Sequence, residues 1–415
     1  MLSILFLINF ILLLSFFSFD SKTSISNEFY PKSSSTSLMW NYTMGDSGRG
    51  LAISPNGKYL AAGSWDHNVY LFDTSNPVPL WNRTIVGLVG EVAISDDGEY
   101  IVIGSDDNNV YLFHRSSSTP LWNYTAGNLI STVAITPDGQ YIVAGSWDYN
   151  IYVFNRTSST PIFNWSFSNR VYGVDISSDG QIIVAGGLGV GVHVFNISYL
   201  LTAPIWSNNS MTSIYSVDLS KNNKYLVVGS LTGATGTIFL YDITSSQPLQ
   251  QYETAETFGH VSISDDGMYF VGSVSFESRS YLFERGNPNP KWNYTANNQI
   301  EETEISGDGN FIGCGSYDKT FYFFSRLNIY ASIDKQEMFC IQKYETDHMI
   351  FSVEISEHGE YIAILSNDDN IYMFHNELSQ TPDGTPDPSI PFGDFTLIWT
   401  IIGISVFIII AKKRD

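Results

Sequence analysis

One short motif, a serine followed two residues later by an aspartate, recurs at five equivalent turns between two apolar runs of this 415-residue chain. The pairs are Ser64 and Asp66, Ser105 and Asp107, Ser146 and Asp148, Ser316 and Asp318, and Ser366 and Asp368. A ring of such carboxylates could attract cations, but calcium needs several convergent oxygen ligands and each repeat supplies one carboxylate. Asp and Ser side chains readily bond the amides of their own turn. We therefore expect Asp66, Asp107, Asp148, Asp318 and Asp368 to be structural turn residues.

Aromatic residues accompany these motifs and could recognise a partner. Trp65 and Trp147 lie inside two of the motifs, with Tyr149 and Tyr317 in comparable positions. If they are exposed on one face, they could stack on a sugar or anchor a protein. The alternative is packing against a neighbouring repeat. Trp65, Trp147, Tyr149 and Tyr317 are thus the candidate binding residues.

Residues with catalytic or metal-binding spacing do not stand out. The seven histidines are scattered, and the sequence has no Ser-His-Asp, Walker or zinc motif. The glycine-rich run at 186–191 (GGLGVG) lacks the Lys-Ser/Thr pair and the helix that a phosphate loop needs. We expect no catalysis, no cofactor and no metal site.

The only two cysteines are Cys314 and Cys340. We expect one strand to lie between theirs, which separates them by two strand spacings, about 9.6 Å. This exceeds the roughly 7 Å limit for a disulfide. The sequence therefore predicts two buried free thiols.

The composition excludes some partners. Twenty Lys and Arg residues against 42 Asp and Glu residues give a formal net charge of −22, which argues against nucleic-acid binding. Hydrophobic residues make up 43% of the chain and charged residues 15%, so the composition is not that of a disordered protein.

The motifs belong to one unit that is repeated eight times. Each unit carries a turn between two apolar runs, and these turns are 41 to 50 residues apart, ending at Gly57, Gly98, Gly139, Gly180, Asn223, Gly267, Gly309 and Gly359. A period near 40–45 residues with strand-like contents is typical of a β-propeller blade.

One unit shows why a blade of four antiparallel strands is expected. Residues 122–125, 132–135, 141–146 and 150–154 are rich in aromatic and β-branched residues, and Thr136–Gly139 (TPDG) has the composition of a tight turn. The last unit lacks an outer strand, whereas residues 40–43 precede the first complete blade. The N-terminal strand can therefore close the ring and remove two exposed sheet edges. We expect an all-β propeller of eight blades, with seven as the fallback if one irregular unit has decayed.

The repeats resemble known families. The run AISPNGKYLAAGSWDHNVYLFD (52–73) resembles WD-repeat propellers, and VYLFHRSSSTPLWNYT (110–125) also resembles the repeats of pyrroloquinoline-quinone-type propellers. The resemblance covers about residues 38–377. It departs from the WD pattern because LFDT, LFHR and VFNR stand where the closing Trp-Asp pair is usual, and Gly-His precedes a first strand only at Gly259–His260. Most blades should therefore lack the usual His-Ser-Asp-Trp network.

Two apolar runs bracket the repeats and predict export. Residues 1–20 are expected to be a signal peptide, with a retained anchor as the alternative, followed by a Ser/Thr-rich linker at 21–37. After the propeller (38–377) come a Pro-rich tether (378–394), an uncharged transmembrane helix (395–411) and a basic cytoplasmic end (412–415). This tail resembles those of prokaryotic, and in particular archaeal, envelope proteins; in some families such tails are cut and replaced by a lipid.

Eight N-x-S/T sequons lie between the two apolar runs and agree with export. The candidate glycosylation sites are Asn41, Asn82, Asn123, Asn155, Asn164, Asn196, Asn208 and Asn293. Five lie on a repeated strand motif, so repetition for structural reasons is the alternative explanation.

These observations favour a membrane-anchored extracellular propeller that acts as a binding or scaffolding module for a protein or a glycan, without catalysis of its own. The alternative is a propeller enzyme or quinone-cofactor carrier of the cell envelope. A third interpretation makes it part of a surface layer, where the partner is another copy of the chain. We expect the partner to meet the end that bears the Ser-x-Asp turns, because the variable loops that enter each first strand lie at that end.

Overall fold

The computed structural model describes residues 36–199, 203–232, 235–256, 258–274, 276–326 and 340–379. The chain divides into two units, residues 1–34 and 35–415, and every described residue belongs to the second. The predicted signal peptide, nearly all of the linker and the tether, the transmembrane segment and the basic end lie outside the described residues.

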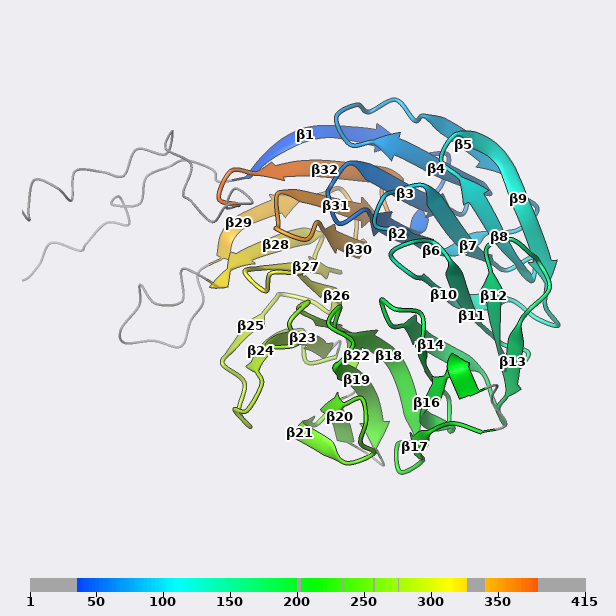
Figure 1. Cartoon of the computed structure of the whole chain (residues 1–415). Coiled ribbons are helices and arrows are strands. Elements are labelled where there is room, and N and C mark those ends of the chain that lie inside the picture. Colours follow the sequence, from blue (N-terminus) through cyan, green and yellow to red (C-terminus); the bar gives the residue numbers. More distant parts are fainter. Residues whose placement is uncertain are drawn as a thin grey trace, which may run out of the picture. The chain divides into compact units, whose positions relative to one another are not determined.

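The described residues form eight sheets of four strands arranged around an axis (Figure 1). The first four blades comprise β2 (Gly48–Ile53), β3 (Tyr59–Ser64), β4 (Asn68–Asp73) and β5 (Trp81–Thr84); β6 (Val89–Ile94), β7 (Tyr100–Ser105), β8 (Asn109–His114) and β9 (Ser117–Thr125); β10 (Ile130–Ile135), β11 (Tyr141–Ser146), β12 (Asn150–Asn155) and β13 (Phe163–Ser166); and β14 (Val171–Ile176), β15 (Ile182–Gly187), β16 (Gly191–Asn196) and β17 (Trp206–Asn208). The last four comprise β18 (Ser213–Leu219), β19 (Tyr225–Thr232), β20 (Thr235–Asp242) and β21 (Pro248–Thr254); β22 (Phe258–Ile263), β23 (Tyr269–Val274), β24 (Arg279–Glu284) and β25 (Trp292–Thr295); β26 (Ile300–Ile305), β27 (Phe311–Ser316), β28 (Thr320–Ser325) and β29 (Cys340–Glu345); and β30 (Ile350–Ile355), β31 (Tyr361–Ser366), β32 (Asn370–Asn376) and β1 (Thr36–Thr43). The prediction of eight antiparallel four-stranded blades is confirmed, so the seven-blade fallback is wrong.

The N-terminal strand closes the ring, as predicted. β1 pairs antiparallel with β32, with Trp40 opposite Met373, and lies beside it in Figure 1. The backbone N–H of Glu357 in the last blade also donates to the carbonyl of Pro55 in the first blade, at 2.9 Å. Antiparallel pairing and a turn-to-turn hydrogen bond therefore join the two ends of the repeat array.

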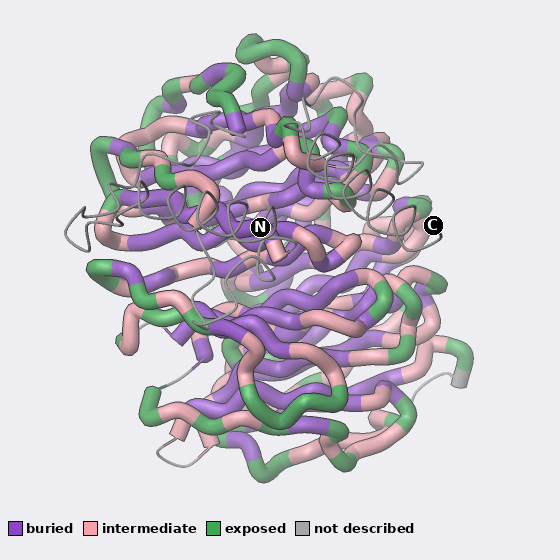
Figure 2. Tube along the Cα trace, turned by 90° about the vertical axis from the view of Figure 1, so that its left-hand side faces the viewer, coloured by how far each residue is buried: buried purple, intermediate pink, exposed green. Residues whose placement is uncertain are grey.

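Tryptophans of the outer strands fasten neighbouring blades to each other. The ring of Trp40 in β1 packs on Phe72 in the next blade, with centroids 5.4 Å apart, and its Nε1–H donates to the carbonyl of Thr74 at 2.6 Å. Trp122 packs in the same way on Phe154 and donates to the carbonyl of Arg156 at 2.8 Å. Because the two faces of each blade are covered by its neighbours, burial is nearly continuous along the two middle strands, such as β3 and β4. The exposed residues gather at the turns and outer edges (Figure 2).

The tight turns of the repeat need glycine for two reasons. Gly98 has φ +66°, a left-handed conformation that favours glycine, and the Gly98 N–H donates to the carbonyl of Ser95 at 2.8 Å. A Cβ at Gly98 would also lie 2.3 Å from Cδ2 of Tyr59 in the preceding blade. The same residue therefore shapes the turn and allows a ring from the neighbouring blade to approach.

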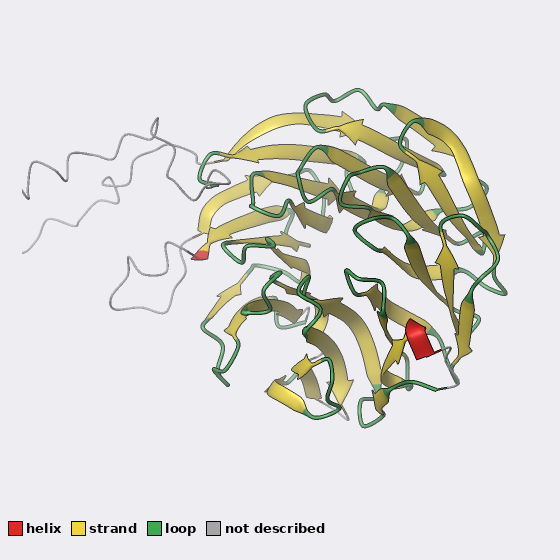
Figure 3. Cartoon of the chain, in the orientation of Figure 1, coloured by secondary structure: helices red, strands yellow, loops and turns green. Residues whose placement is uncertain are grey.

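Helical structure in the described part of the chain is limited to a short 3₁₀ turn, η1 (Ile197–Tyr199), and to 3₁₀ geometry at Arg326; Figure 3 shows two short red segments. Within the same residues, no helix is long and apolar enough to cross a membrane.

The two cysteines are both free. β28 lies between their strands, with Tyr322 opposite Cys314 and Phe324 opposite Cys340. Cys314 is buried, but Cys340 is only half-buried because it begins an outermost strand, so the expectation of two buried thiols is wrong for Cys340.

Candidate binding site at the propeller axis

The Ser-x-Asp turns form a hydrogen-bond network within each blade that has one. In the third blade, Asp148 Oδ1 accepts from the N–H of Asn150 at 3.0 Å, and Oδ2 accepts from the hydroxyl of Tyr152 and the N–H of Gly127, both at 2.7 Å. Ser146 Oγ accepts from the N–H of Asp148 at 3.1 Å. Burial raises the pKa of Asp148, but the hydrogen bonds from Tyr152 and the two amides outweigh burial and hold the pKa below its ordinary value.

The same arrangement recurs with a tyrosine four residues after the aspartate. The pairs are Asp66 with Tyr70, Asp107 with Tyr111, Asp318 with Tyr322 and Asp368 with Tyr372. Because Gly127 and its equivalents belong to loops that enter first strands, these bonds place the entry loops and the Ser-x-Asp turns at one end of the propeller. We call this end the turn face.

Two of the predicted aromatic residues line one cavity at the turn face. Trp65 is 37% exposed and Trp147 is half-buried, and both border a cavity of 640 Å³ at the axis, which we call the mouth cavity. Tyr317 is half-buried, and its ring packs edge-on against Phe351, another lining residue, at 5.9 Å. Tyr149 is 45% exposed at a left-handed corner (φ +78°) and does not line this cavity.

Arginines cover parts of the aromatic surface. The guanidinium of Arg49 lies 5.9 Å from the ring centroid of Trp65 and 4.8 Å from that of Phe351, and 3.8 Å from the carboxylate of Glu301. Arg170 lies 4.0 Å over the ring of Trp147. Two aromatic residues that line the mouth cavity thus already carry a guanidinium near the ring, an arrangement that is favourable for positive charge.

Below the aromatic rim, carboxylates project into the axis from alternate positions of the innermost strands. They are Glu91 on β6, Asp175 on β14, Asp218 on β18, Glu302 and Glu304 on β26, and Glu354 on β30. Some line two cavities: Glu91 borders both the mouth cavity and a middle cavity of 300 Å³, and Asp218 borders both the middle cavity and a far cavity of 260 Å³. An acidic channel therefore runs along the axis.

Crowding of these acids disfavours their charged forms. Burial, strengthened by the nearby charge of Glu302 and opposed by Arg49, raises the pKa of Glu91 to about 8. Burial also raises the pKa values of Asp175 and Asp218, and the charge of Asp175 adds to the effect at Asp218. At neutral pH, some of the channel carboxyl groups are therefore protonated and uncharged, so they need no counter-ion.

Several channel acids have a structural task. The innermost strand of each blade has a free edge whose N–H groups need acceptors. Asp175 accepts from the N–H of Leu219 in the next blade at 2.7 Å, and Asp218 accepts from that of Ile263 at 2.8 Å. These carboxylates thus join neighbouring blades around the axis.

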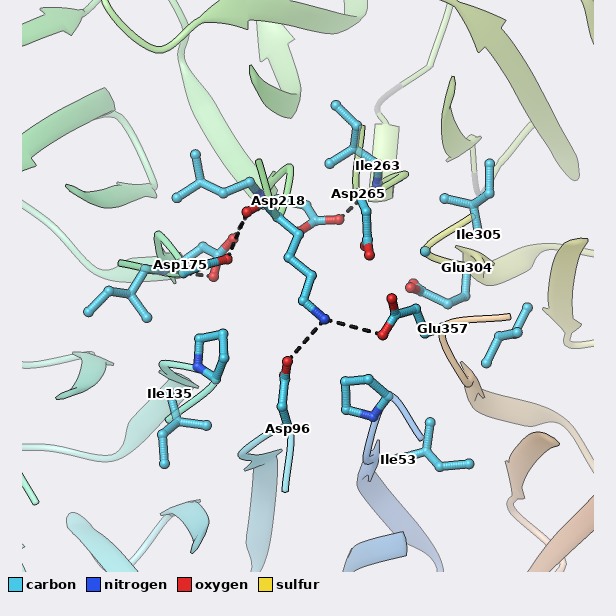
Figure 4. Close-up of a pocket in the computed structure, with 18 residues that line it drawn as sticks. Ile53, Asp96, Ile135, Asp175, Asp218, Ile263, Asp265, Glu304, Ile305 and Glu357 are labelled. Atoms are coloured by element: carbon cyan, nitrogen blue, oxygen red, sulfur yellow. Dashed lines mark hydrogen bonds and ion pairs between the residues drawn. The ribbon is translucent and has the colours of Figure 1, made fainter. Parts of the chain in front are cut away.

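The opposite end of the channel is closed by a lysine. Lys221 Nζ lies 3.0 Å from Asp96 and 3.3 Å from Glu357, which come from turns of two other blades. Figure 4 shows Asp96, Glu357 and Asp265 pointing into the axis at this end. The charges of Lys221 and its partners therefore meet across the far cavity, and the mouth cavity is the roomier end.

The channel acids were missed by sequence reasoning, although a signal was present. The innermost strands read VAI in the second and third blades but VDI, VDL, TEI and VEI at Asp175, Asp218, Glu304 and Glu354. A charge at a fixed strand position in an otherwise apolar repeat points to a side chain that neighbouring blades do not cover. Among the described residues, no three His, Cys, Asp or Glu side chains are placed to share a metal ion.

The sequons divide into two groups. Asn41, Asn82, Asn123, Asn164 and Asn293 lie on outer strands and are exposed. Asn155, Asn196 and Asn208 are half-buried, and Asn208 donates to the hydroxyl of Tyr241 at 3.0 Å. The threonine of the Asn82 sequon, Thr84, also has a structural role, because its Oγ1 donates a hydrogen bond to Asn68 Oδ1 on the neighbouring strand at 2.7 Å.

The structure is an eight-bladed β-propeller, a fold typical of protein-interaction and scaffolding modules, and part of it matches WD-type repeats. The family described as "WD domain, G-beta repeat" matches residues 46–73, 84–114 and 118–155. No curated protein matches the sequence.

Solved structures match the propeller as a fold. One, titled "Structure of Dos1 propeller", is 12% identical with a TM-score of 0.69, and the match covers 82% of this chain and 96% of that chain. Because 1930 chains of solved structures match, this likeness shows the fold and does not single out a function.

Proposed function

We propose that this chain is a membrane-anchored module, exported so that its propeller lies outside the cell, and that it binds a protein partner over the mouth cavity. The observation that carries the binding proposal is the gathering of Trp65, Trp147 and Phe351 around one cavity at the turn face. Aromatic side chains dominate many interface hot spots because they offer a large contact area with few rotatable bonds. Loops held on a rigid scaffold are also where recognition is commonly built.

The cellular location rests on the sequence and on the sequons. The apolar run at 395–411, followed by a basic end, supports a membrane anchor with a cytoplasmic C-terminus. Five sequon asparagines are exposed on outer strands, away from the mouth cavity, so glycans there would leave the turn face free. The Ser/Thr-rich N-terminal segment and the tail also support a prokaryotic, and in particular archaeal, envelope origin.

The binding proposal is tested with two exposed aromatic residues of the turn face. The partner is first captured from an envelope extract with the purified propeller, and its affinity is then measured for Trp65→Ala and for Tyr149→Ala, whose ring lies outside the mouth cavity. We expect Trp65→Ala to weaken binding by about 2 kcal/mol, as at an interface hot spot, and Tyr149→Ala to leave it unchanged. Equal affinities for both variants, with unchanged thermal midpoints, would contradict this site.

The exposed ring of Trp65 would also suit a sugar, so a glycan is the second candidate ligand. Retained binding after enzymatic removal of glycans from the partner supports a protein surface. We further propose that the propeller has no catalysis of its own. An absorbance band above 300 nm in the purified protein, from a bound cofactor, would contradict this.

A further inference from the structure

The mouth cavity combines two kinds of group that favour the same class of ligand. Its walls are aromatic and aliphatic, and they are formed by Trp65, Leu88, Leu129, Trp147, Tyr172 and Phe351. Its acidic lining is formed by Glu91, Asp106, Glu301, Glu302 and Glu354. Carboxylates attract positive charge, and aromatic faces attract it as well, so an anionic or purely apolar ligand is disfavoured.

Two basic residues line the cavity, and both already have an acidic neighbour. Arg49 lies beside Glu301, and His260 Nε2 lies 3.3 Å from Glu302. The carboxyl group of Glu91 lines the cavity and has no hydrogen-bond or ion-pair partner among the described side chains. The indole N–H of Trp147 is also buried without an acceptor. A cationic occupant could pair with the carboxyl group of Glu91 but not with the indole N–H, which needs an acceptor.

Arg49 shows the chemistry that this cavity accepts. Its guanidinium stands against the rings of Trp65 and Phe351 and beside the carboxylate of Glu301. A second cation that enters deeper would meet the same combination of aromatic wall and carboxyl group. Its charge would favour the ionised form of Glu91, which would release its proton and become the ion-pair partner.

We propose that the mouth cavity receives a lysine or arginine side chain from a basic segment of a partner protein. The aliphatic stem would lie against Trp65, Leu88 and Leu129, and the charged head would reach Glu91. Long basic side chains have this dual character, since an apolar stem carries a polar tip. The inference rests on the proposed protein-binding function and names the chemistry of the partner at the same site.

The experiment uses the purified protein and labelled hexa-arginine as the probe, with hexaglutamine as the neutral control. Binding is measured at physiological ionic strength, where charges on the exposed surface are screened beyond about 8 Å. The cavity variant is Glu91→Gln combined with Glu302→Gln. Its matched control is Glu253→Gln with Glu345→Gln, which removes the same charge from exposed positions on outer strands.

We expect the cavity variant to bind hexa-arginine at least tenfold more weakly and the control variant to change less than twofold. Equal losses in both would mean that the probe follows the net charge of −22, and would overturn the inference. Free spermidine that binds in the same Glu91-dependent way while hexa-arginine does not would also overturn it, in favour of a free polyamine. The affinity of the captured partner separates the two proposals. If Trp65→Ala weakens binding of the partner and the cavity variant does not, the binding site is retained but the proposal that it receives a basic side chain is refuted.

A variant that is expected to strengthen binding of hexa-arginine tests the same inference. Arg49→Ala removes the only arginine that lines the cavity, so the affinity for hexa-arginine should rise severalfold. Lys224→Ala, at an exposed turn near the other end, removes the same charge and should have little effect. An equal rise in both variants would indicate long-range attraction alone and would count against the cavity.

Discussion

Removing one indole from the closing strand should cost as much stability as removing one from the middle of the repeat array. Trp40→Ala takes away a ring that is 8% exposed, its contact with Phe72 and its hydrogen bond to the carbonyl of Thr74. Replacing a buried tryptophan by alanine costs about 3–5 kcal/mol. Because a domain is stable by about 5–15 kcal/mol, this loss is a large fraction of the total.

Trp122→Ala is the matched control for this prediction. Trp122 makes the same two contacts, with Phe154 and the carbonyl of Arg156, between blades that are continuous in the chain. Urea unfolding of each purified variant, followed by far-ultraviolet circular dichroism, gives the two losses of unfolding free energy. If β1 closes the ring, both losses fall in the same range. A loss below about 1 kcal/mol for Trp40→Ala, with the full loss for Trp122→Ala, would refute closure by β1.

Three further outcomes are expected. A carboxyl group whose pKa is raised on folding stabilises the fold below its ordinary pKa and loses that contribution as the pH rises through the folded pKa. Because the pKa of Glu91 is about 8 and that of Asp265 about 6, the thermal midpoint should be higher at pH 5 than at pH 8. Glu91→Gln should reduce this difference, and an unchanged difference would contradict the assignment. Gly98→Ala should lower stability by about 1–3 kcal/mol more than Gly286→Ala in urea unfolding, since both have positive φ but a Cβ at Gly286 meets nothing within 4 Å; equal losses would assign the whole effect to backbone strain. Protease added to intact cells should release the propeller by cutting within residues 378–393, whereas digestion only after lysis would reverse the proposed topology.

The architecture could be predicted because its information is repeated. Eight turns at similar spacing, and an outer strand that stands ahead of the first complete unit, determine both the number of blades and the way in which the ring closes. The Ser-x-Asp turns could be assigned because the bonds of Asp148 to its own turn are local. The tyrosine that completes each network, such as Tyr152, was missed because it lies on the following strand.

The site could be predicted only in part because it is made by residues from different blades. Trp65 and Trp147 belong to the first and third blades and meet at one cavity only through the closed ring. Tyr149 is two residues from Trp147 in the sequence, but it lies at a left-handed corner and does not line the mouth cavity. The channel acids went unrecognised because the cavities that they line form only where innermost strands of several blades meet at the axis.

The central claim, that a partner docks over the mouth cavity, is tested most directly by site-specific photo-crosslinking in intact cells. A photoreactive phenylalanine analogue is placed at Trp65, beside the cavity, and separately at Leu80, which is 50% exposed just before the outer strand β5. We expect a crosslinked product of defined mass from position 65 and none from position 80. A product from position 80 with none from position 65 would place the interface on the outer circumference and contradict the claim.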